Sequence, residues 1–346
     1  YRIDGMLQEK LALPKSIQDS LVSRIKILSG LKIDEKRAPQ DGRFNFKMGE
    51  EEVDLRVSTL PTVNGEKVVM RLLKKSGGIP TMNDLGLRGP QLKVLEEAIQ
   101  KPYGIVLVTG PTGSGKSTTL YSILNLLNKP TVNIVTLEDP VEYQIKGVNQ
   151  VQINPQAGLT FATGLRSFLR QDPNIILVGE IRDSETTSLA MQAALTGHLV
   201  FSTLHTNDAA TAIPRLIDLG AEPFLISSVL NAVVAQRIVR KIAPEGSQEY
   251  TPSPELQQNI VEVLGDLLPE KYKQDPGSMR LLKVHDTTGA DSGYHGRVGI
   301  FEVIKITRGI ENLVVKNSTA QAIQDVALQE GLITMLQDGY LKALDG

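Results

Sequence analysis

One stretch of the chain combines glycine, lysine and a hydroxyl residue at a spacing that suits phosphate binding. Gly110, Gly115, Lys116 and Ser117 satisfy the pattern G-x-x-x-x-G-K-[ST]. In this pattern the loop amides cradle phosphate oxygens, the lysine reaches the β- and γ-phosphates, and the hydroxyl ligates Mg²⁺. We therefore predict that ATP and Mg²⁺ are the cofactors. The residues expected to contact the nucleotide in this loop are Gly110, Pro111, Thr112, Gly113, Ser114, Gly115, Lys116, Ser117 and Thr118.

Two glutamates follow apolar runs that are typical of buried strands. Glu180 comes after residues 175–178 and one glycine, and Glu138 comes directly after a second such run. A carboxylate at the end of a strand beside a phosphate loop either holds Mg²⁺, usually through water, or orients the attacking water. We assign Glu180 to Mg²⁺, together with Ser117, and Glu138 to the hydrolytic water. Glu142 is the second candidate for the latter role.

Two histidines bracket a further apolar run. His198 precedes this run and His205 follows it, at the end where ligands bind if the run is a parallel strand. His205 is therefore a candidate sensor of the γ-phosphate, and His198 a weaker candidate for nucleotide contact. The alternative, that either is an ordinary core or surface histidine, stays open. Metal binding by this pair is not expected, because no thiolate or carboxylate partner completes a standard site.

Strand-like runs alternate with helix-like segments between residues 91 and 205. This alternation predicts an α/β fold with a mostly parallel sheet that is covered by helices. Ligands of such sheets lie at the carboxyl ends of the strands, which here are Gly110, Glu138, Glu180 and His205. Further along, residues 224–239 are apolar with few polar interruptions and end in basic residues. We predict that this segment is a buried helix.

The rest of the sequence predicts a second, smaller domain. Residues 1–76 contain strand-like stretches around hairpin dipeptides and one amphipathic helix, which indicates a small α+β domain. Residues 77–84 read as a linker, and residues 85–346 form the phosphate-loop core. Within the core, residues 242–296 are rich in glycine, proline and charge. We predict that they form an inserted module.

Composition narrows the classes of function. The net charge is -2 and aromatic residues make up 4% of the chain, so a nucleic-acid-binding channel with stacking platforms is not expected. There are no cysteines, which excludes disulfides and thiolate metal sites and fits a cytoplasmic location. No run of 18 apolar residues is present, so we expect no direct insertion into a membrane.

Four stretches in order carry a family resemblance. They are residues 110–118, 136–142, 165–183 and 197–205, and the likeness extends over nearly the whole chain. Together they resemble the secretion ATPase superfamily of type IV pilus assembly, type II secretion and pilus retraction motors. Among its branches, the chain most resembles the pilus assembly (extension) ATPases.

The resemblance implies a RecA-like ATPase core behind a PAS-like N-terminal domain whose start is missing. It implies a homo-hexamer that hydrolyses ATP to ADP and phosphate and drives an inner-membrane platform protein and the pilus or secretion machinery. The location implied is cytoplasmic, peripheral at the inner membrane through partners. Type II secretion and pilus retraction are the alternatives within the family. A RecA-like nucleic-acid translocase is the alternative outside it.

Two arginines of the small domain match positions where the family presents arginine fingers to the nucleotide. These are Arg56 and Arg71, with Arg43 as a weaker third candidate. An arginine there can stabilise the charge that develops on the transferred phosphoryl group. From the sequence alone, both could equally be surface arginines.

The inserted module departs from the family pattern. Assembly and type II ATPases usually carry two C-x-x-C pairs in this segment and bind zinc through them. This chain has no cysteine, so we expect no zinc. The module must fold by packing alone or be loosely ordered.

Overall fold

The computed structural model describes residues 1–3, 6–49, 51–74, 78–284 and 293–346. The chain divides into two compact units, Tyr1–Ile79 and Pro80–Gly346. Parts of three predicted segments lie outside the described residues: residues 4–5, 50, 75 and 76 of the predicted first domain, residue 77 of the predicted linker and residues 285–292 of the predicted module. Among the described residues, no helix combines the length and the apolar character needed to cross a membrane.

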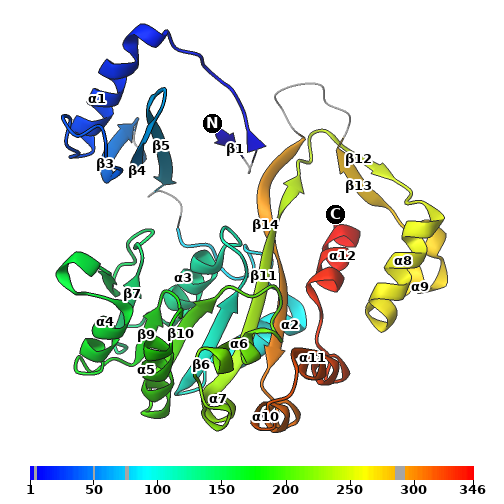
Figure 1. Cartoon of the computed structure of the whole chain (residues 1–346). Coiled ribbons are helices and arrows are strands. Elements are labelled where there is room, and N and C mark those ends of the chain that lie inside the picture. The colour runs from blue at the N-terminus through cyan, green and yellow to red at the C-terminus, as the bar shows by residue number, and fades with distance from the viewer. Residues whose placement is uncertain (4–5, 50, 75–77, 285–292) are drawn as a thin grey trace. The chain divides into compact units, whose positions relative to one another are not determined.

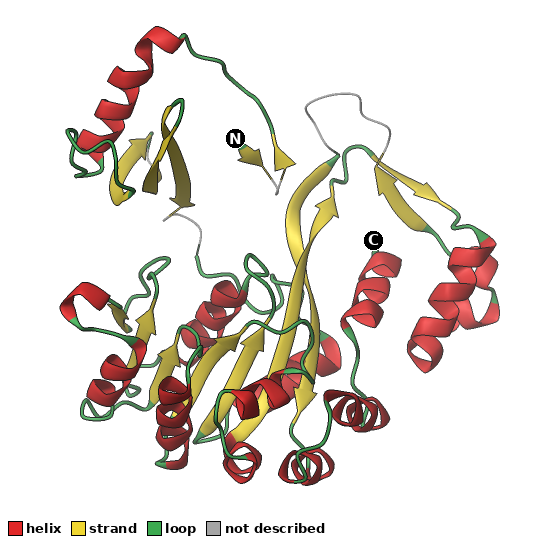
Figure 2. Cartoon of the chain, viewed as in Figure 1, coloured by secondary structure: helices red, strands yellow, loops and turns green. Residues whose placement is uncertain are grey.

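The first unit is a small α+β structure (Figures 1 and 2). Its β3–β4–β5 sheet is antiparallel throughout. One face of the sheet buries Val53 and Val57. Gly42 lies on that face too, where an added Cβ would meet the carbonyl oxygen of Ser29 at 2.4 Å, just past the end of α1. The elements are β1 (Arg2–Ile3), β2 (Met6–Leu7), a 3-10 turn (Lys15–Ile17), α1 (Gln18–Leu28), β3 (Gln40–Met48), β4 (Glu51–Thr62) and β5 (Gly65–Lys74).

The second unit is built on a seven-stranded sheet in the order β14-β11-β6-β10-β9-β7-β8. All neighbouring strands are parallel except the β11–β14 pair. The sheet strands are β6 (Gly104–Thr109), β7 (Ile134–Glu138), β8 (Asn149–Gln152), β9 (Ile175–Val178), β10 (Leu199–Leu204), β11 (Leu230–Ile242) and β14 (Tyr294–Lys305). The predicted α/β class is therefore confirmed.

Helices cover the sheet and follow its strands along the chain (Figure 2). They are α2 (Gly89–Ile99), α3 (Lys116–Leu127), α4 (Phe161–Phe168), α5 (Ser184–Leu195), α6 (Ala212–Asp218), α7 (Pro223–Val229), α10 (Arg308–Val315), α11 (Ala320–Gln329) and α12 (Met335–Asp345).

The central strand β6 shows why the apolar runs in the sequence are continuous. All six of its residues are buried. Ile105 and Leu107 join the apolar cluster formed with α4, α5 and α7. Val106 and Val108 point to the opposite face, because side chains alternate along a strand, and they are equally buried there.

The predicted helix over residues 224–239 is correct only as far as Val229 and is wrong beyond it. Helix α7 ends at Val229, and the chain continues as β11 between β6 and β14. A strand that is buried on both faces is apolar at consecutive positions, as a buried helix is, so the pattern alone does not separate them. Polar residues of the strand are satisfied by tertiary hydrogen bonds; for example, Asn231 Nδ2 donates to the carbonyl of Tyr103 at 2.9 Å.

The segment between β11 and β14 has an apolar core of its own. Its elements are β12 (Ser247–Tyr250), α8 (Pro254–Leu264), α9 (Glu270–Gln274) and β13 (Leu281–Val284), with 3-10 turns at Gly265–Leu267 and Pro276–Ser278. The residues that form this core are Ile260, Leu264, Leu268, Tyr272, Met279, Leu281 and, from α12, Leu344. We call the described part of this segment, residues 243–284 and 293, the module.

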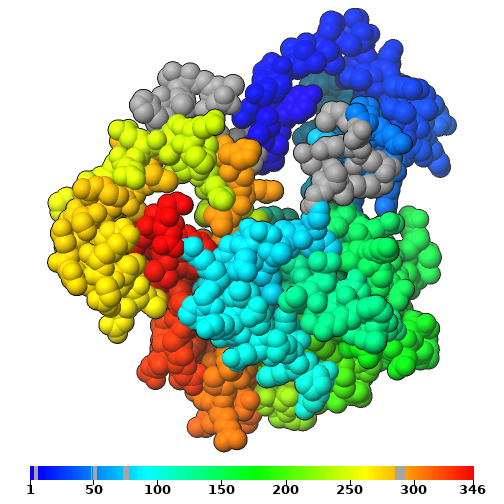
Figure 3. Space-filling model, turned by 180° about the vertical axis from the view of Figure 1, so that it is seen from behind, coloured from blue at the N-terminus to red at the C-terminus, as the bar shows by residue number. Residues whose placement is uncertain are grey.

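Helix α12 closes the module. In the view from behind, α12 (red) lies against the module (yellow) (Figure 3). Two hydrogen bonds fix the contact: Gln337 Nε2 donates to the carbonyl of Val263 at 2.9 Å, and the Tyr340 hydroxyl bonds Asn259 Oδ1 at 2.6 Å. The described part of the module is therefore held together by its apolar core and by these contacts with α12, and it contains no cysteine that could form a thiolate site.

The first prediction concerns this core. Ile260 is fully buried, so Ile260→Ala should lower the free energy of unfolding in urea by about 2–5 kcal/mol, through lost burial and the cavity left behind. Leu267→Ala, at an exposed position of the same module, is the matched control and should have little effect. Adding EDTA should leave both melting curves unchanged. A chelator-sensitive transition, or a harmless Ile260→Ala, would show that something other than apolar packing holds the module.

Candidate nucleotide-binding site

Four predicted site residues lie at one edge of the main sheet. Strands β6, β10, β9 and β7 are adjacent and parallel, so their carboxyl ends meet along the same edge. Beyond those ends come Gly110, His205 and Glu180, and Glu138 is the last residue of β7. The strand order therefore places the phosphate loop directly next to the His205 strand, with the two glutamates on the strands that follow.

The phosphate loop runs from Gly110 to the first residue of α3. Gly115 caps that helix with φ at +88°, and no side chain caps its N-terminus. The first-turn N–H groups of a helix have no partner within the helix, so they suit an anion. The hydroxyls of Thr109 and Ser114 are buried here without a hydrogen-bond partner among the described residues. The N–H groups at the start of α3 thus offer donors to a phosphate chain, which fits ATP.

Lys116 folds over this loop. Its Nζ donates to the carbonyl oxygens of Gly110 at 2.8 Å and Pro111 at 3.1 Å. Burial lowers the pKa of Lys116, and the nearby carboxylate of Glu180 acts in the opposite direction. The ammonium therefore lies against the loop and within the electrostatic reach of Glu180, where it can interact with a phosphate.

Glu180 is buried and contacts the side chains of Arg182 and His205. Its Oε2 lies 2.5 Å from Arg182 Nε and 3.6 Å from His205 Nε2. The pKa of His205 is lowered, first by burial and then by the Lys116 charge, while Glu180 raises it and Arg182 lowers it. Arg182 was not among the predicted site residues. Its position two residues after Glu180 is the signal that could have identified it.

Glu138 is held by three side chains, none of them predicted. Oε1 accepts from Thr136 Oγ1 at 2.5 Å and from Gln150 Nε2 at 3.2 Å, and Oε2 accepts a short hydrogen bond from the Tyr121 hydroxyl. A carboxylate has about four lone-pair positions, so this network leaves one for a further donor such as water. The backbone N–H of Glu142 also bonds the Tyr121 hydroxyl, at 3.1 Å, which joins both candidate glutamates to one network.

The ring of Tyr121, which donates to Glu138, packs against a second tyrosine ring. Tyr143 stacks edge-on against Tyr121, with ring centroids 4.6 Å apart. Burial, and then the charge of Glu138, raises the pKa of Tyr121, and the same two causes raise the pKa of Tyr143 to about 12. Both rings therefore stay protonated, and Tyr121 acts as a fixed donor to Glu138.

His198 lies apart from these residues. It precedes the first residue of β10, which pairs with Gly104 at the start of β6. Its Nδ1 lies 2.8 Å from the carbonyl oxygen of Ala193. Because parallel strands run in the same direction, His198 is at the amino edge of the sheet, opposite the phosphate loop. We therefore remove His198 from the set of residues expected at the phosphate loop of its own chain.

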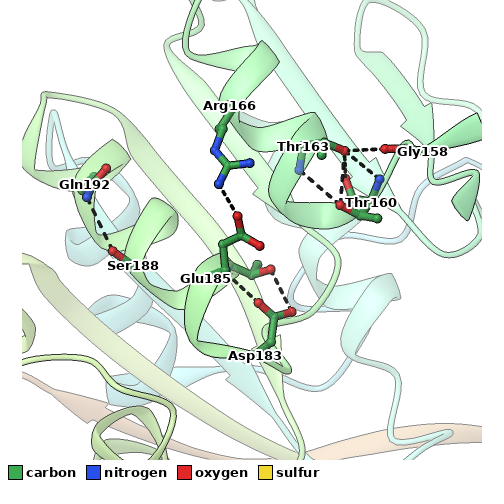
Figure 4. A network of polar contacts seen from close by, with 9 residues as sticks. Gly158, Thr160, Thr163, Arg166, Asp183, Glu185, Ser188 and Gln192 are labelled. Carbon is green, nitrogen blue, oxygen red and sulfur yellow. Dashed lines mark hydrogen bonds and ion pairs between the residues drawn. The ribbon is translucent and has the colours of Figure 1, made fainter.

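Helix α5, which starts just after the loop that carries Glu180, and helix α4 are each fixed at their N-termini by side-chain caps (Figure 4). Asp183 caps α5, accepting from the Thr186 N–H at 2.8 Å, and a Thr160–Thr163 capping box starts α4. Arg166 of α4 and Glu185 of α5 form an ion pair across the gap. Both partners of that pair are about half exposed, so it adds little stability, and the caps set the geometry.

The candidate arginine fingers belong to the first unit. Arg43 pairs with Arg56 and Arg56 pairs with Arg71 in the β3–β4–β5 register. Residues directly opposite in antiparallel strands project from the same face, so the arginines form one row, which we call the arginine row. This face is opposite the one that packs on α1.

The pKa of His205 provides the second prediction. Removing the nearby cation with Lys116→Met should raise the pKa of His205, and Glu180→Gln should lower it further, because the favourable carboxylate is lost. NMR titration of the histidine ring protons measures both shifts. The resonances of His198, at the opposite edge of the sheet, serve as the internal control. A His205 pKa that ignores both substitutions would mean that the three side chains do not share one site.

The chain was compared with known proteins. A family described as "Type II/IV secretion system protein" matches residues 1–346. The type IV pilus assembly ATPase PilB of Thermus thermophilus is 49% identical over 345 residues, which cover 100% of this chain and 38% of that protein. The type II secretion system protein E of Xanthomonas campestris pv. campestris is 46% identical over 346 residues and is covered to 60%. The chain thus spans between about two fifths and three fifths of these relatives.

Solved structures agree on the fold. A crystal structure of the pilus retraction motor PilT with bound ADP is 28% identical, with a TM-score of 0.61, and the match covers 97% of this chain and 88% of that one. The Legionella pneumophila ATPase DotB is 22% identical, with a TM-score of 0.66, and the match covers 96% of this chain and 81% of DotB. At this level of identity the match shows only that the fold is shared. The predicted RecA-like core is the fold of these ATPases. The chain belongs to the family of type II/IV secretion system proteins.

Proposed function

We propose that this chain is the motor part of an Mg²⁺-dependent ATPase that powers type IV pilus assembly. The observation that carries the proposal is the grouping of Lys116, Glu180 and His205 around a phosphate loop, in a chain of this family. The similarity to a pilus assembly ATPase over the whole chain supports the choice of process.

The site residues have distinct tasks in this proposal. Bound Mg²⁺–ATP supplies the phosphoryl group and the metal that neutralises its charge. The loop amides and Lys116 hold the phosphates, and Ser117 and Glu180 hold the metal, Glu180 through water. Glu138 uses its remaining lone pair to orient the attacking water. His205, which contacts Glu180, senses whether the γ-phosphate is present.

We further propose that six copies form a ring and that the arginine row completes the site. Arg56 and Arg71 would face the transferring phosphoryl group when the first unit closes on a nucleotide. The ring would act in the cytoplasm, at the inner membrane, through a platform protein of the pilus machinery.

Type II secretion is the second candidate, because a secretion protein E is nearly as similar over the full chain. Deleting the gene in its source organism separates the two. Loss of surface pili with secretion intact supports pilus assembly, and the reverse result supports secretion. The retraction alternative predicts excess pili, and stimulation of ATP hydrolysis by single-stranded DNA would support the translocase.

The third prediction tests the role of Glu138. Glu138→Gln should keep ATP affinity but lower kcat by about 10²-fold or more, because the charge that orients water is lost. Steady-state phosphate release and equilibrium binding of a fluorescent ATP analogue measure the two effects. Lys116→Ala should instead weaken binding. Tyr143→Phe is the matched control, since that hydroxyl makes no hydrogen bond to Glu138 in the described structure. Wild-type turnover by Glu138→Gln would transfer the role to Glu142.

The fourth prediction tests the arginine row. Arg56→Ala and Arg71→Ala should each lower ATPase activity at least tenfold, while nucleotide binding and assembly persist, because the arginines act on the transition state. Arg24→Ala, on exposed helix α1 of the same unit, is the matched control. Full activity in both sheet variants would make these arginines ordinary surface residues.

A further inference from the structure

Strand β11 extends past the point where β6 gives way to the phosphate loop. Ala235 pairs with Thr109, the last residue of β6. The next β11 residue, Gln236, therefore lies alongside the loop itself. In Figure 1, β11 and its partner β14 run as long strands beyond the rest of the sheet. The loop thus has a neighbour that is far away in the sequence.

The side chain of Gln236 links the end of the loop to the start of α3. It is 2% exposed. Its Nε2 donates to the carbonyl oxygen of Ser114 at 2.5 Å, and its Oε1 accepts from Thr119 Oγ1 at 2.8 Å. Ser114 precedes the lysine of the loop, and Thr119 is in the first turn of α3. One buried amide therefore sets the position of the loop relative to the helix that follows it.

The backbone of β11 also limits the shape of the loop. A Cβ on Gly110 would lie 2.6 Å from the carbonyl oxygen of Gln236, and a Cβ on Gly115 would lie 2.8 Å from Ile238 Cδ1. Real Cβ atoms essentially never lie this close to another heavy atom, so Gly110 is needed for the close approach of the β11 backbone as well as for its backbone angle. At Gly115 the positive φ requires glycine, and the end of the Ile238 side chain would also have to shift.

We propose that Gln236 is a positioning residue for phosphate binding. It does not contact the nucleotide; it holds the Ser114 carbonyl and the start of α3 so that the loop amides converge on the phosphates. The proposal rests on the proposed nucleotide-binding function of the loop. Preorganised donors bind more tightly because they do not have to be ordered on binding, so loss of this brace should weaken affinity for the phosphate chain.

Two substitutions test the proposal. Gln236→Met keeps the length of the side chain and removes both hydrogen bonds, and Thr119→Val removes only one of them with little change of shape. The control is Gln91→Met. Gln91 is also a buried glutamine, and it donates to two carbonyls, of Phe301 at 2.7 Å and Ile333 at 3.2 Å, away from the loop.

For Gln236→Met we expect the Kd for ATP and the inhibition constant for inorganic tripolyphosphate to rise together by at least tenfold. KM should rise equally, with kcat within about threefold of wild type. Thr119→Val should give a smaller change in the same direction. Gln91→Met should lower the melting temperature about as much as Gln236→Met does. It should leave the Kd for ATP and the inhibition constant for tripolyphosphate unchanged.

Three results would overturn the proposal: unchanged ATP affinity in Gln236→Met, a loss of kcat alone, or an equal loss of affinity in Gln91→Met. If Gln236→Met does not fold, Thr119→Val decides, and wild-type affinity in that variant overturns the proposal. Failure of the wild-type chain to bind ATP would instead reject the proposed function, so the two failures are distinguishable.

Discussion

Between Thr109 and Lys116 the backbone must turn sharply and direct its N–H groups to one point, with a packed strand immediately behind it. Gln236 and Ile238 of β11 occupy that space, and both glycines have a positive φ, so a side chain at Gly110 or Gly115 would be strained. The sheet order follows from this requirement, because β11 must be adjacent to β6 to reach the loop. The rigid sheet then fixes where the other strands deliver their polar residues.

Charge is arranged around that loop in alternation. The ammonium of Lys116 faces Glu180, whose carboxylate also contacts Arg182 and His205. A buried carboxylate between cations is stable without a ligand, and adding a metal and a phosphate chain would redistribute these pairs. Glu138 is different, since its partners are neutral donors. The two glutamates therefore sit in environments suited to different tasks, one electrostatic and one directional.

The sequence predicted the local features well. The phosphate loop is a continuous stretch, and alternating strands and helices imply that the carboxyl ends share an edge, so the α/β class was correct. Contacts between residues that are brought together only by the strand order could not be predicted from the sequence. Gln236, for example, lies more than a hundred positions from Ser114. The same limit explains the wrong helix at residues 224–239. It also explains why His198 was expected near the nucleotide. The sequence alone does not show which end of the strand faces the phosphate loop, so a residue before the strand and one after it are equal candidates.

The closure of the module by α12 affects how the protein is made. On the ribosome, α8 and α9 emerge with Ile260 and Tyr272 before β14, α10 and α11 are synthesised, and α12 follows with Leu344. Until α12 arrives, the nascent module lacks part of its core, and its apolar side chains stay open to chaperones and proteases. Both sheet neighbours of β6 also come later in the chain. The phosphate-loop sheet is completed when β14 has been synthesised, and the core of the module only when α12 follows.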